Sequence, residues 1–432
     1  MLEAQPDWIP ARLFTTAGLR GSHEQEVRAS AALMAILGAV PAFSQPLLKP
    51  LGAPGGSIQT FAEVILKTRS GDTLRPDGVV LVTRGQRSWG CLVEVKTGRA
   101  ELTKKQVEGY VRLARRHGFD AVLTVSNQLR GRADELPYDL SKVVQGKTDV
   151  HHLSWWRILT EARRAEHEQR IDDPDQAWLL GELIRYLADE RSGCAALDGM
   201  GSSWTKVRDG VRAQTIGKRD PALLVVVQRW EQVVEYIGLL LSQELGTDVT
   251  QRLQPDAEAR GRRAVQRLLD DGALKAELRI KDAAGPLFLE ADLRAGQTRA
   301  AARIDAPQKG QARGRIGWLL RQLKEAPRDV RIDAAYERAQ RTQGATLAKA
   351  QEDPDLLRFA EDRQRPPRQF TISVTRPMGG GAGRGRRAFV DATIAQATGF
   401  YRDVLQDIRA WQASPPQLSD DDVDPDAARE PA

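Results

Sequence analysis

The sequence predicts an α/β fold in its N-terminal third, with a mixed central sheet flanked by helices, followed by an α+β domain. Three observations lead to this prediction. A segment with apolar residues at helical spacing comes first, three strand-like runs follow it, and a strand–helix–strand step comes next. Strands joined by tight turns pair antiparallel, whereas a strand–helix–strand step favours parallel strands covered by helices. The 432 residues are about two to three times the usual length of one domain, so two domains are expected.

The first predicted element is a helix at residues 20–40. Apolar residues recur there at helical spacing from Val27 through Ala31 and Met34, and acidic residues occupy its first turn. Proline and glycine residues in Pro41–Gly56 end this helix. Three strand-like runs follow, separated by turn residues, at Ser57–Lys67, Leu74–Arg84 and Ser88–Lys96.

The next elements alternate between helix and strand. A helix is predicted for Thr103–His117, with Gly118 closing it, and Ala121–Ser126 forms a short apolar strand. A further strand runs into Leu153, and Trp155–Arg170 is helical again. Tryptophans at such a strand-to-helix corner are usually core residues, so both Trp155 and Trp156 are expected to be buried.

The second half of the chain predicts an α+β domain. A helix begins at Asp173-Pro174, and Pro221–Leu245 is a long, very apolar helix. The other predicted elements are an antiparallel meander at Leu274–Lys281, Leu287–Leu293 and Thr298–Asp305, helices at Gly314–Leu323 and Ala388–Trp411, and strands at Val330–Ala335 and Gln369–Thr375. The predicted divisions are an α/β domain at 15–170, a helical linker region at 171–200, an α+β domain at 201–412 and a disordered acidic tail at 413–432.

Composition and charge limit the classes of function. Hydrophobic residues make up 41% of the chain and charged residues 28%, which is typical of a soluble globular protein. Two cysteines, Cys91 and Cys194, are too few for a disulfide framework, and no secretion signal or membrane span is recognised, so the cytoplasm is the expected location. Residues 1–165 contain 23 Lys and Arg against 16 Asp and Glu. This basic excess suggests an anionic partner, nucleic acid first.

Charged residues occupy the end of an otherwise apolar strand. Alternation along this strand places Leu92, Glu94 and Lys96 on one face, and charged groups at such a position are costly to bury without compensation. Asp77 opens the preceding strand, and a tight turn brings the two strands side by side. Two carboxylates and one ammonium are therefore expected to converge at one end of the sheet. Hard oxygen ligands of this kind suit Mg²⁺.

The pattern resembles the PD-(D/E)xK superfamily of restriction-endonuclease-like nucleases. Asp77 is followed, after 16 intervening residues, by Glu94-Val95-Lys96, and the predicted order of helices and strands matches the core of that superfamily. Gln106 and Tyr110 on the next helix match the QxxxY element of its RecB-like exonuclease branch. The resemblance covers about residues 15–165.

The resemblance implies a nuclease that depends on Mg²⁺ or Mn²⁺ and acts on nucleic acid, DNA in preference to RNA. Asp77 and Glu94 would be metal ligands, with the carbonyl of Val95 as a third. Lys96 would position or activate the attacking water and stabilise charge on the transition state. No membrane partner is expected, and the C-terminal domain would bind substrate, a protein partner or another copy of the chain.

The resemblance also gives roles to residues on the flanking helices. Gln106 would hold Lys96 or a phosphate, and Tyr110 would touch the substrate backbone. The RecB-like branch places an additional metal-coordinating acid on the first helix. Glu24 is preferred for it over Glu26, because Glu24 shares the face of Val27 that is expected to pack on the sheet.

Each of these residues also has a structural interpretation. Glu94 and Lys96 could form an ion pair on an exposed edge strand, and Asp77 could be a turn residue. Gln106 and Tyr110 could lie on an ordinary amphipathic helix face. At the level of function, the alternatives are a catalytically silent nucleic-acid-binding or regulatory protein on a nuclease-like fold, and an unrelated sheet domain that serves as an interaction scaffold.

Overall fold

The structure is a computed structural model of the whole chain, and it describes residues 12–19, 21–132, 135–138, 140, 148–167, 171–194, 199–339, 341–379 and 387–412. The predicted acidic tail at 413–432 lies outside these residues. The chain divides into two compact units. The first comprises Met1–Asp282, Pro286–Ala300 and Thr375–Gly399, and the second Ala283–Gly285, Ala301–Val374 and Phe400–Ala432.

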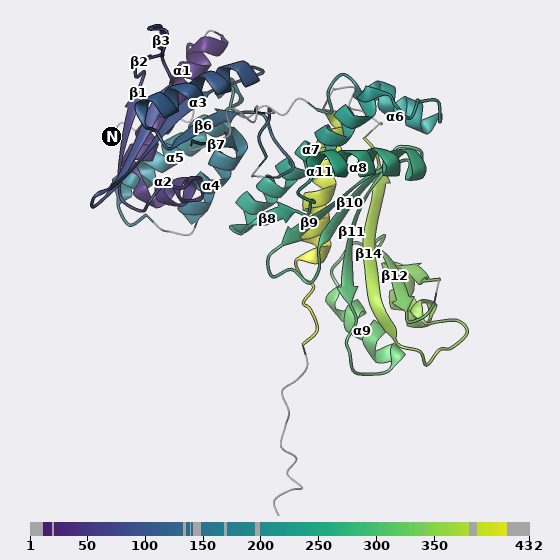
Figure 1. Cartoon of the computed structure of the whole chain (residues 1–432). Coiled ribbons are helices and arrows are strands. Elements are labelled where there is room, and N and C mark those ends of the chain that lie inside the picture. Colours follow the sequence, from purple (N-terminus) through teal and green to yellow (C-terminus); the bar gives the residue numbers. More distant parts are fainter. Residues whose placement is uncertain are drawn as a thin grey trace, which may run out of the picture. The chain divides into compact units, whose positions relative to one another are not determined.

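A five-stranded mixed sheet forms the centre of the N-terminal part of the first unit (Figure 1). Its strands, in spatial order, are β1 (Ser57–Ala62), β4 (Gly78–Arg84), β5 (Arg87–Val95), β6 (Ala121–Ser126) and β7 (Asp149–Ser154). The strands β1, β4 and β5 pair antiparallel, and β5, β6 and β7 pair parallel. The predicted mixed sheet is therefore confirmed. The first two predicted runs are each interrupted, because β2 (Leu66–Lys67) and β3 (Thr73–Leu74) form a separate hairpin.

Helix α3 (Lys104–His117) covers one face of this sheet. Its N-terminus is set by Thr103, which forms a capping box, and its C-terminus by Gly118 in the left-handed conformation. The apolar side of α3, including Val107 and Val111, packs on Leu92 of β5. The cluster also includes Val79 and Val122 from the neighbouring strands. Burial of this apolar face holds α3 on the sheet.

Helix α1 (Ser22–Ala39) lies on the opposite face. A Cβ atom on Gly78 would meet the Met34 side chain of α1, and Gly78 precedes Val79, whose side chain points to the α3 side. The predicted packing face of this helix is wrong in part, because Val27 is 41% exposed and Ala31 is also exposed, whereas Met34 is buried as predicted. The buried side is centred on Ser30, Leu33 and Leu37. A rotation by one residue along the helix, about 100°, accounts for the difference.

Two further helices pack beside α1. The predicted break at Pro41 ends α1, but a short helix α2 (Pro41–Leu48) starts at once, because proline at the first helical position loses no hydrogen bond. Helix α5 (Pro174–Ala188) starts as predicted, with the Asp173 carboxylate accepting from two backbone N–H groups. It contacts α1 and α4 (Trp155–His167), so the helix predicted in the linker region packs on the helices of the N-terminal domain.

A seven-stranded sheet forms the second half of the chain. Its strand order is β13 (Gln343–Thr346), β12 (Arg331–Tyr336), β14 (Pro367–Pro377), β11 (Gln297–Asp305), β10 (Leu287–Asp292), β9 (Ala273–Ile280) and β8 (Val249–Gln251). The β9–β10 pair of the predicted meander is antiparallel. The pairs β12–β13 and β12–β14 are antiparallel as well. Helix α7 (Pro221–Leu245) has the predicted bounds. Helices α6 (Trp204–Arg212) and α8 (Ala257–Asp271) were not predicted; both are rich in arginine and bury only one narrow side.

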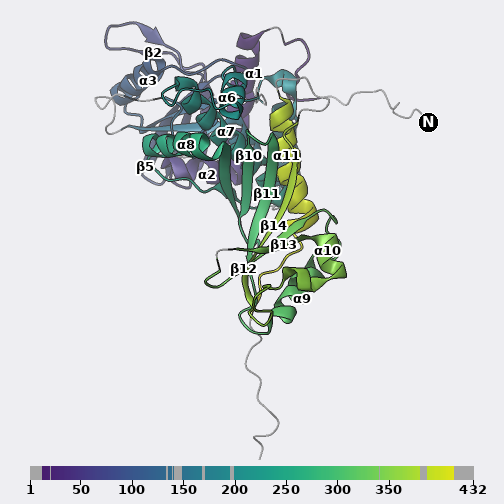
Figure 2. The ribbon, with the colours of Figure 1, turned by 90° about the vertical axis from the view of Figure 1, so that its right-hand side faces the viewer.

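The helices near the C-terminus belong to different units. Helix α11 (Ala388–Phe400) runs along the first unit's part of the sheet (Figure 2), where Gln396 Nε2 donates to the backbone oxygen of Thr298 at 3.1 Å. The predicted helix to Trp411 is too long, since α11 passes into a π-helical turn that ends at Leu405. In the second unit, α9 (Ala312–Gln322) and α10 (Leu347–Glu352) lie together beside β12 and β13.

In the part of the chain that the structure describes, no single helix is long and apolar enough to cross a membrane. One pair, Ser22–Ala39 with Pro41–Leu51, reaches the required length and composition only jointly, and its halves are bent by 102°.

Candidate active site

Asp77 and Glu94 lie at the same end of neighbouring strands. The register pairs Gly78 with Val93, so Asp77, one residue before β4, lies level with Glu94 on β5. The Asp77 Oδ2 atom accepts a hydrogen bond from the backbone N–H of Val95 at 2.7 Å. The antiparallel pairing of β4 with β5 therefore brings the two predicted carboxylates together and fixes the position of one of them.

Lys96 follows β5 directly and completes the cluster. Its backbone N–H donates to Val125 at 2.8 Å, which continues the parallel pairing with β6. Its ammonium donates to Glu26 Oε1 at 2.7 Å, to Glu94 Oε1 at 3.0 Å and to the carbonyl of Val95 at 3.0 Å. All three donor positions of the ammonium are used, and its side chain is only 13% exposed.

Glu26, rather than Glu24, is the acid of α1 that reaches Lys96. This differs from the preference in the sequence analysis, and the reason is the rotated packing face of α1. Glu26 stands one turn before Ser30 and two turns before Leu33, and both of these are buried. The helix therefore directs Glu26 toward the end of the sheet.

The pair Glu26 and Glu24 gives a matched test. Glu26→Gln is expected to reduce cleavage of nucleic acid by about 10- to 100-fold, as for other residues that orient a reactive group. Glu24→Gln makes the same chemical change two residues earlier on the same helix, and it is expected to leave the cleavage rate within about threefold. Steady-state rates of both variants on one labelled substrate check this. Equal losses in the two variants would contradict the assignment of Glu26.

Burial and mutual repulsion disfavour the charged carboxylates. Burial, followed by the charge of Glu94, raises the pKa of Asp77 to about 7. Burial also raises the pKa of Glu94, with Lys96 and Tyr110 acting in the opposite direction. One oxygen of Glu94, Oε2, is buried and has no hydrogen-bond partner. Three carboxylates surround one ammonium, so the cluster has an excess of negative charge.

The two proton-bearing groups of the cluster stay protonated. Burial opposes the charge of Lys96, but the hydrogen bond to Glu26 and the charge of Glu94 outweigh it and raise the pKa of the ammonium. Burial and the Glu94 carboxylate raise the pKa of the Tyr110 phenol well above its usual range. Tyr110 is partly buried on α3 and packs against the cluster around Leu92. It therefore lies beside Glu94 as a neutral donor.

Gln106 has a local structural role. Its Oε1 accepts from the Thr103 backbone N–H at 3.2 Å and from Thr103 Oγ1 at 3.0 Å, which completes the capping box of α3. Its side chain is exposed, and the structure does not bring it to Lys96. A contact with substrate phosphate stays a prediction.

Two substitutions separate capping from substrate contact. Gln106→Glu keeps the capping box, because glutamate is a standard residue at that position, but it adds a negative charge where a phosphate is expected. Gln106→Ala removes the cap and costs about 0.5–1 kcal/mol of stability. If Gln106 contacts phosphate, cleavage falls more for the glutamate than for the alanine variant. If its role is capping alone, the glutamate variant cleaves at the wild-type rate, and melting temperatures measured in parallel identify the cap.

Helix α3 also presents basic side chains to solvent. Five of them are exposed: Lys104, Lys105, Arg112, Arg115 and Arg116. Arg112 lies 3.9 Å from Glu108, a spacing at which an exposed pair contributes little. The helix that carries Tyr110 thus has a basic, solvent-facing side suited to a phosphate backbone.

Trp155 supports Lys96 from the other side. It is 1% exposed, as predicted for a core residue, and its indole N–H donates to the backbone oxygen of Lys96 at 2.9 Å. Nearby, burial lowers the pKa of His152 to about 4, and its ring bonds Thr124 Oγ1 at 3.0 Å and the Gln128 carbonyl at 2.8 Å. The sequence predicts Trp155 only as a core residue, and no sequence pattern indicates its hydrogen bond to Lys96.

The donor set fits a hard divalent cation. Asp77, Glu94 and the Val95 carbonyl offer oxygen ligands, and Glu94 Oε2 is buried without a partner. Among the described residues, no group of three or more His, Cys, Asp or Glu side chains is arranged to hold a metal ion. In this structure the ammonium of Lys96 lies between Glu26 and Glu94.

Comparison with models of known protein families gives no match, and no curated protein matches the sequence.

Proposed function

We propose that the chain is a metal-dependent nuclease with a restriction-endonuclease-like core, which hydrolyses phosphodiester bonds of nucleic acid, DNA in preference to RNA. The observation that carries this proposal is the convergence of Asp77, Glu94 and Lys96 at one sheet end. Their spacing in the sequence resembles the PD-(D/E)xK pattern, and the register of β4 and β5 brings them into contact range. Charged groups that are buried at a high energetic cost are typical of functional sites.

Asp77, Glu94 and the carbonyl of Val95 would hold Mg²⁺ or Mn²⁺. When bound, the ion supplies a Lewis acid that polarises the phosphate and lowers the pKa of water. Charge balance supports this role. The carboxylates of Asp77, Glu94 and Glu26 outnumber the ammonium of Lys96, and a bound dication would offset the net negative charge. Burial and then the charge of Glu94 raise the pKa of Asp77, and the buried Oε2 of Glu94 is left without a hydrogen-bond partner.

The protein's own groups orient the reactants. Lys96 keeps its charge at neutral pH. When Glu94 and the Val95 carbonyl bind metal in place of the ammonium, its released donors can align the attacking water and stabilise negative charge on the phosphate. Glu26 holds the ammonium in place from α1, and the Trp155 N–H holds the backbone of Lys96. Tyr110 keeps its proton and can donate a hydrogen bond to the substrate backbone. The basic side of α3 supplies non-specific affinity for phosphates.

A catalytically silent binding protein is the second candidate. The observation that favours it is the closed arrangement of Lys96, whose ammonium is fully used by Glu26, Glu94 and Val95. The basic side of α3 would then bind nucleic acid without cleavage. The two candidates differ in one measurable property, hydrolysis in the presence of metal.

The deciding experiment incubates the purified chain with labelled single- and double-stranded DNA and RNA. Mg²⁺ or Mn²⁺ is present in one arm and a chelator in the other. The nuclease proposal expects cleavage only with metal, faster on DNA, leaving 5′-phosphate ends. Binding of the same substrates without cleavage in any arm would support the silent alternative instead.

Substrate topology gives a further prediction. Gln106 and Tyr110 lie four residues apart on one side of α3, a spacing that can follow consecutive backbone groups of one strand rather than both walls of a groove. Linear and single-stranded DNA are therefore expected to be degraded at least about tenfold faster than covalently closed duplex. Linear, nicked and closed circular DNA compared in one gel check this. Discrete fragments from closed circles at an equal rate would exclude the exonuclease-like version while leaving a general nuclease.

A further inference from the structure

The 3₁₀ turn Glu190–Ser192, together with Gly193, connects the candidate active site to a part of the chain outside the nuclease resemblance. The turn follows α5, and Asp189 starts it by accepting from the Arg191 backbone N–H at 2.9 Å. Gly193 ends it in the left-handed conformation, with a φ of 73°. Ser192, inside the turn, is fully buried. We call residues 190–193 the Gly193 turn.

The Gly193 turn contacts the N-terminal end of α1. The N-cap residue of α1 is Gly21, which has no side chain to accept from the free N–H groups of the first helical turn. Gln25 anchors this end of the helix instead, because its Nε2 atom donates to the Arg191 carbonyl at 2.9 Å. Gly193 leaves room for the amide, since a Cβ atom there would lie 2.9 Å from Gln25 Oε1. The next residue is Glu26, so this contact also positions the Glu26 carboxylate.

The Gly193 turn also contacts the segment that follows Lys96. The backbone N–H of Gly98 donates to the Gly193 carbonyl at 2.8 Å. Asn127, the residue after β6, joins the two segments, because its Nδ2 group donates to the Gly193 carbonyl at 2.7 Å and to the Gly98 carbonyl at 3.0 Å. Both amide hydrogens of Asn127 are used in this way. Thr97, which lies between Lys96 and Gly98, is fully buried. These hydrogen bonds fix the backbone directly after Lys96.

The contacts close a ring that includes the ion pair of Lys96 and Glu26. On the helix side, Gln25 directly precedes Glu26. On the strand side, Gly98 stands two residues after Lys96, so at most about 7 Å of chain separates them. The Gly193 turn joins these two sides, and the contact of 2.7 Å between Lys96 Nζ and Glu26 Oε1 completes the ring. The distance between α1 and the end of β5, and with it the orientation of the ammonium, therefore depends on the turn.

We propose that the Gly193 turn positions the ion pair of Lys96 and Glu26 in the candidate active site. Gln25 and Asn127 are the positioning residues, and they act on the reaction only through this ion pair. The expected effect on cleavage rests on the proposed nuclease function. The turn lies beyond residues 15–165, the range that resembles the nuclease superfamily, so a segment outside that core completes the site.

Steady-state cleavage of a labelled single-stranded DNA in Mg²⁺ tests the proposal. Gln25→Met keeps the length of the side chain but removes its donor, and it is expected to lower kcat by about tenfold. Because Gln25 bonds the protein backbone and not the substrate, KM is expected to stay within about threefold. The double variant Gln25→Met/Glu26→Gln is expected to match Glu26→Gln alone within about threefold, since Gln25 acts through Glu26. Independent roles would multiply the two losses.

Asn127→Ala measures the same effect from the strand side. It is expected to lower kcat and to add no more than about threefold to the loss caused by Glu26→Gln. The hydrogen bonds of Asn127 are more buried than that of Gln25, so this variant is the one more prone to unfold. If a melting scan shows that Asn127→Ala is unfolded, Gln25→Met decides.

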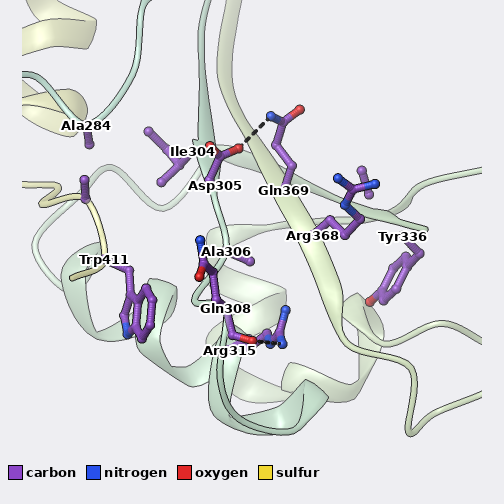
Figure 3. Close-up of a pocket in the computed structure, with 12 residues that line it drawn as sticks. Ala284, Ile304, Asp305, Ala306, Gln308, Arg315, Tyr336, Arg368, Gln369 and Trp411 are labelled. Carbon is purple, nitrogen blue, oxygen red and sulfur yellow. Dashed lines mark hydrogen bonds between the residues drawn. The ribbon is translucent and has the colours of Figure 1, made fainter. Parts of the chain in front are cut away.

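Two glutamines provide matched controls. Gln45 Nε2 donates to the Gly56 carbonyl at 3.3 Å, so Gln45→Met removes the same kind of bond elsewhere on the N-terminal domain. Gln369 Nε2 donates to Asp305 Oδ1 at 3.0 Å in the second unit (Figure 3), and Gln369→Met removes that donor. Both variants are expected to cleave within about threefold of the wild type.

The outcomes separate the positioning role from the nuclease proposal. If the wild type cleaves and Gln25→Met cleaves equally well, the positioning role is overturned and the nuclease proposal stands. The same holds if the loss caused by Gln25→Met multiplies with that of Glu26→Gln. If the wild type does not cleave, the nuclease proposal is overturned, and the positioning role falls with it.

Discussion

Asp77→Asn is expected to lower metal-dependent cleavage by at least about 100-fold while making the metal-free protein more stable. The loss of activity follows because an amide is a weaker ligand for Mg²⁺ than a carboxylate. The gain in stability follows because the asparagine carbonyl can still accept from the Val95 N–H, whereas the repulsion from Glu94 disappears. Opposite effects on activity and stability distinguish a functional carboxylate from a structural one.

The sign of the stability effect depends on pH. The pKa of Asp77 is raised from 3.8 to about 7 in the folded protein, so its contribution to stability is present below about pH 4 and is lost as the pH rises to 7. Near pH 8 the folded chain therefore carries a buried, repelled carboxylate that Asp77→Asn removes. A stabilisation on the order of 2 kcal/mol is expected there, or several degrees in Tm, and almost none at pH 4.

Melting curves at pH 4, 6 and 8 in chelator, together with cleavage rates, measure both effects. Asp72→Asn serves as the control, because the Asp72 side chain is exposed on the same domain and accepts a hydrogen bond from Ser70, away from the Lys96 cluster. Glu94→Gln is expected to lose cleavage as well. Near wild-type cleavage by Asp77→Asn would falsify its assignment as a metal ligand.

Much of the fold could be predicted because hydrophobic periodicity and turn residues mark elements locally. The antiparallel step from β4 to β5 and the parallel step from β5 to β6 follow from the tight turn at Gly85 and from the intervening helix. Asp77, Glu94 and Lys96 could be brought together from the sequence for the same reason, since strand alternation and one hairpin register determine their separation.

The features that the sequence did not predict depend on tertiary packing, which local sequence patterns indicate only weakly. The first helix has apolar residues on much of its surface, so its sequence does not resolve a rotation of about 100° and favours Glu24 over Glu26. Helices α6 and α8 are rich in arginine, and they are stabilised by a few buried residues such as Trp204 and Leu268. The hydrogen bond from Trp155 to Lys96 joins residues that are 59 positions apart, which no local pattern records.

Lys96→Met provides the second large expected effect, with the opposite sign in stability from Asp77→Asn. Methionine fills a similar volume, but it removes the ammonium that bonds Glu26 and Glu94 and lowers the pKa of Asp77. Removing one partner from a buried ion pair costs about 3–5 kcal/mol, because the remaining charge is left uncompensated. The side chain of Lys96 is 13% exposed, so water screens this loss only in part. Cleavage is expected to disappear together with the ammonium.

The destabilisation caused by Lys96→Met is expected to depend on pH and on metal. Without the ammonium, the folded-state pKa values of the carboxylates rise further, so the loss of stability is small near pH 4 and grows as the pH rises toward 8. Millimolar Mg²⁺ is expected to restore part of the Tm at pH 8, since a bound dication replaces the missing charge and stabilises the folded state by mass action. Lys105→Met, an exposed change on α3, is the control and should alter Tm by less than about 2 °C. An unchanged Tm for Lys96→Met at pH 8 in chelator would show that the three carboxylates do not depend on this ammonium, and the charge argument for a metal at this sheet end would then lose its basis.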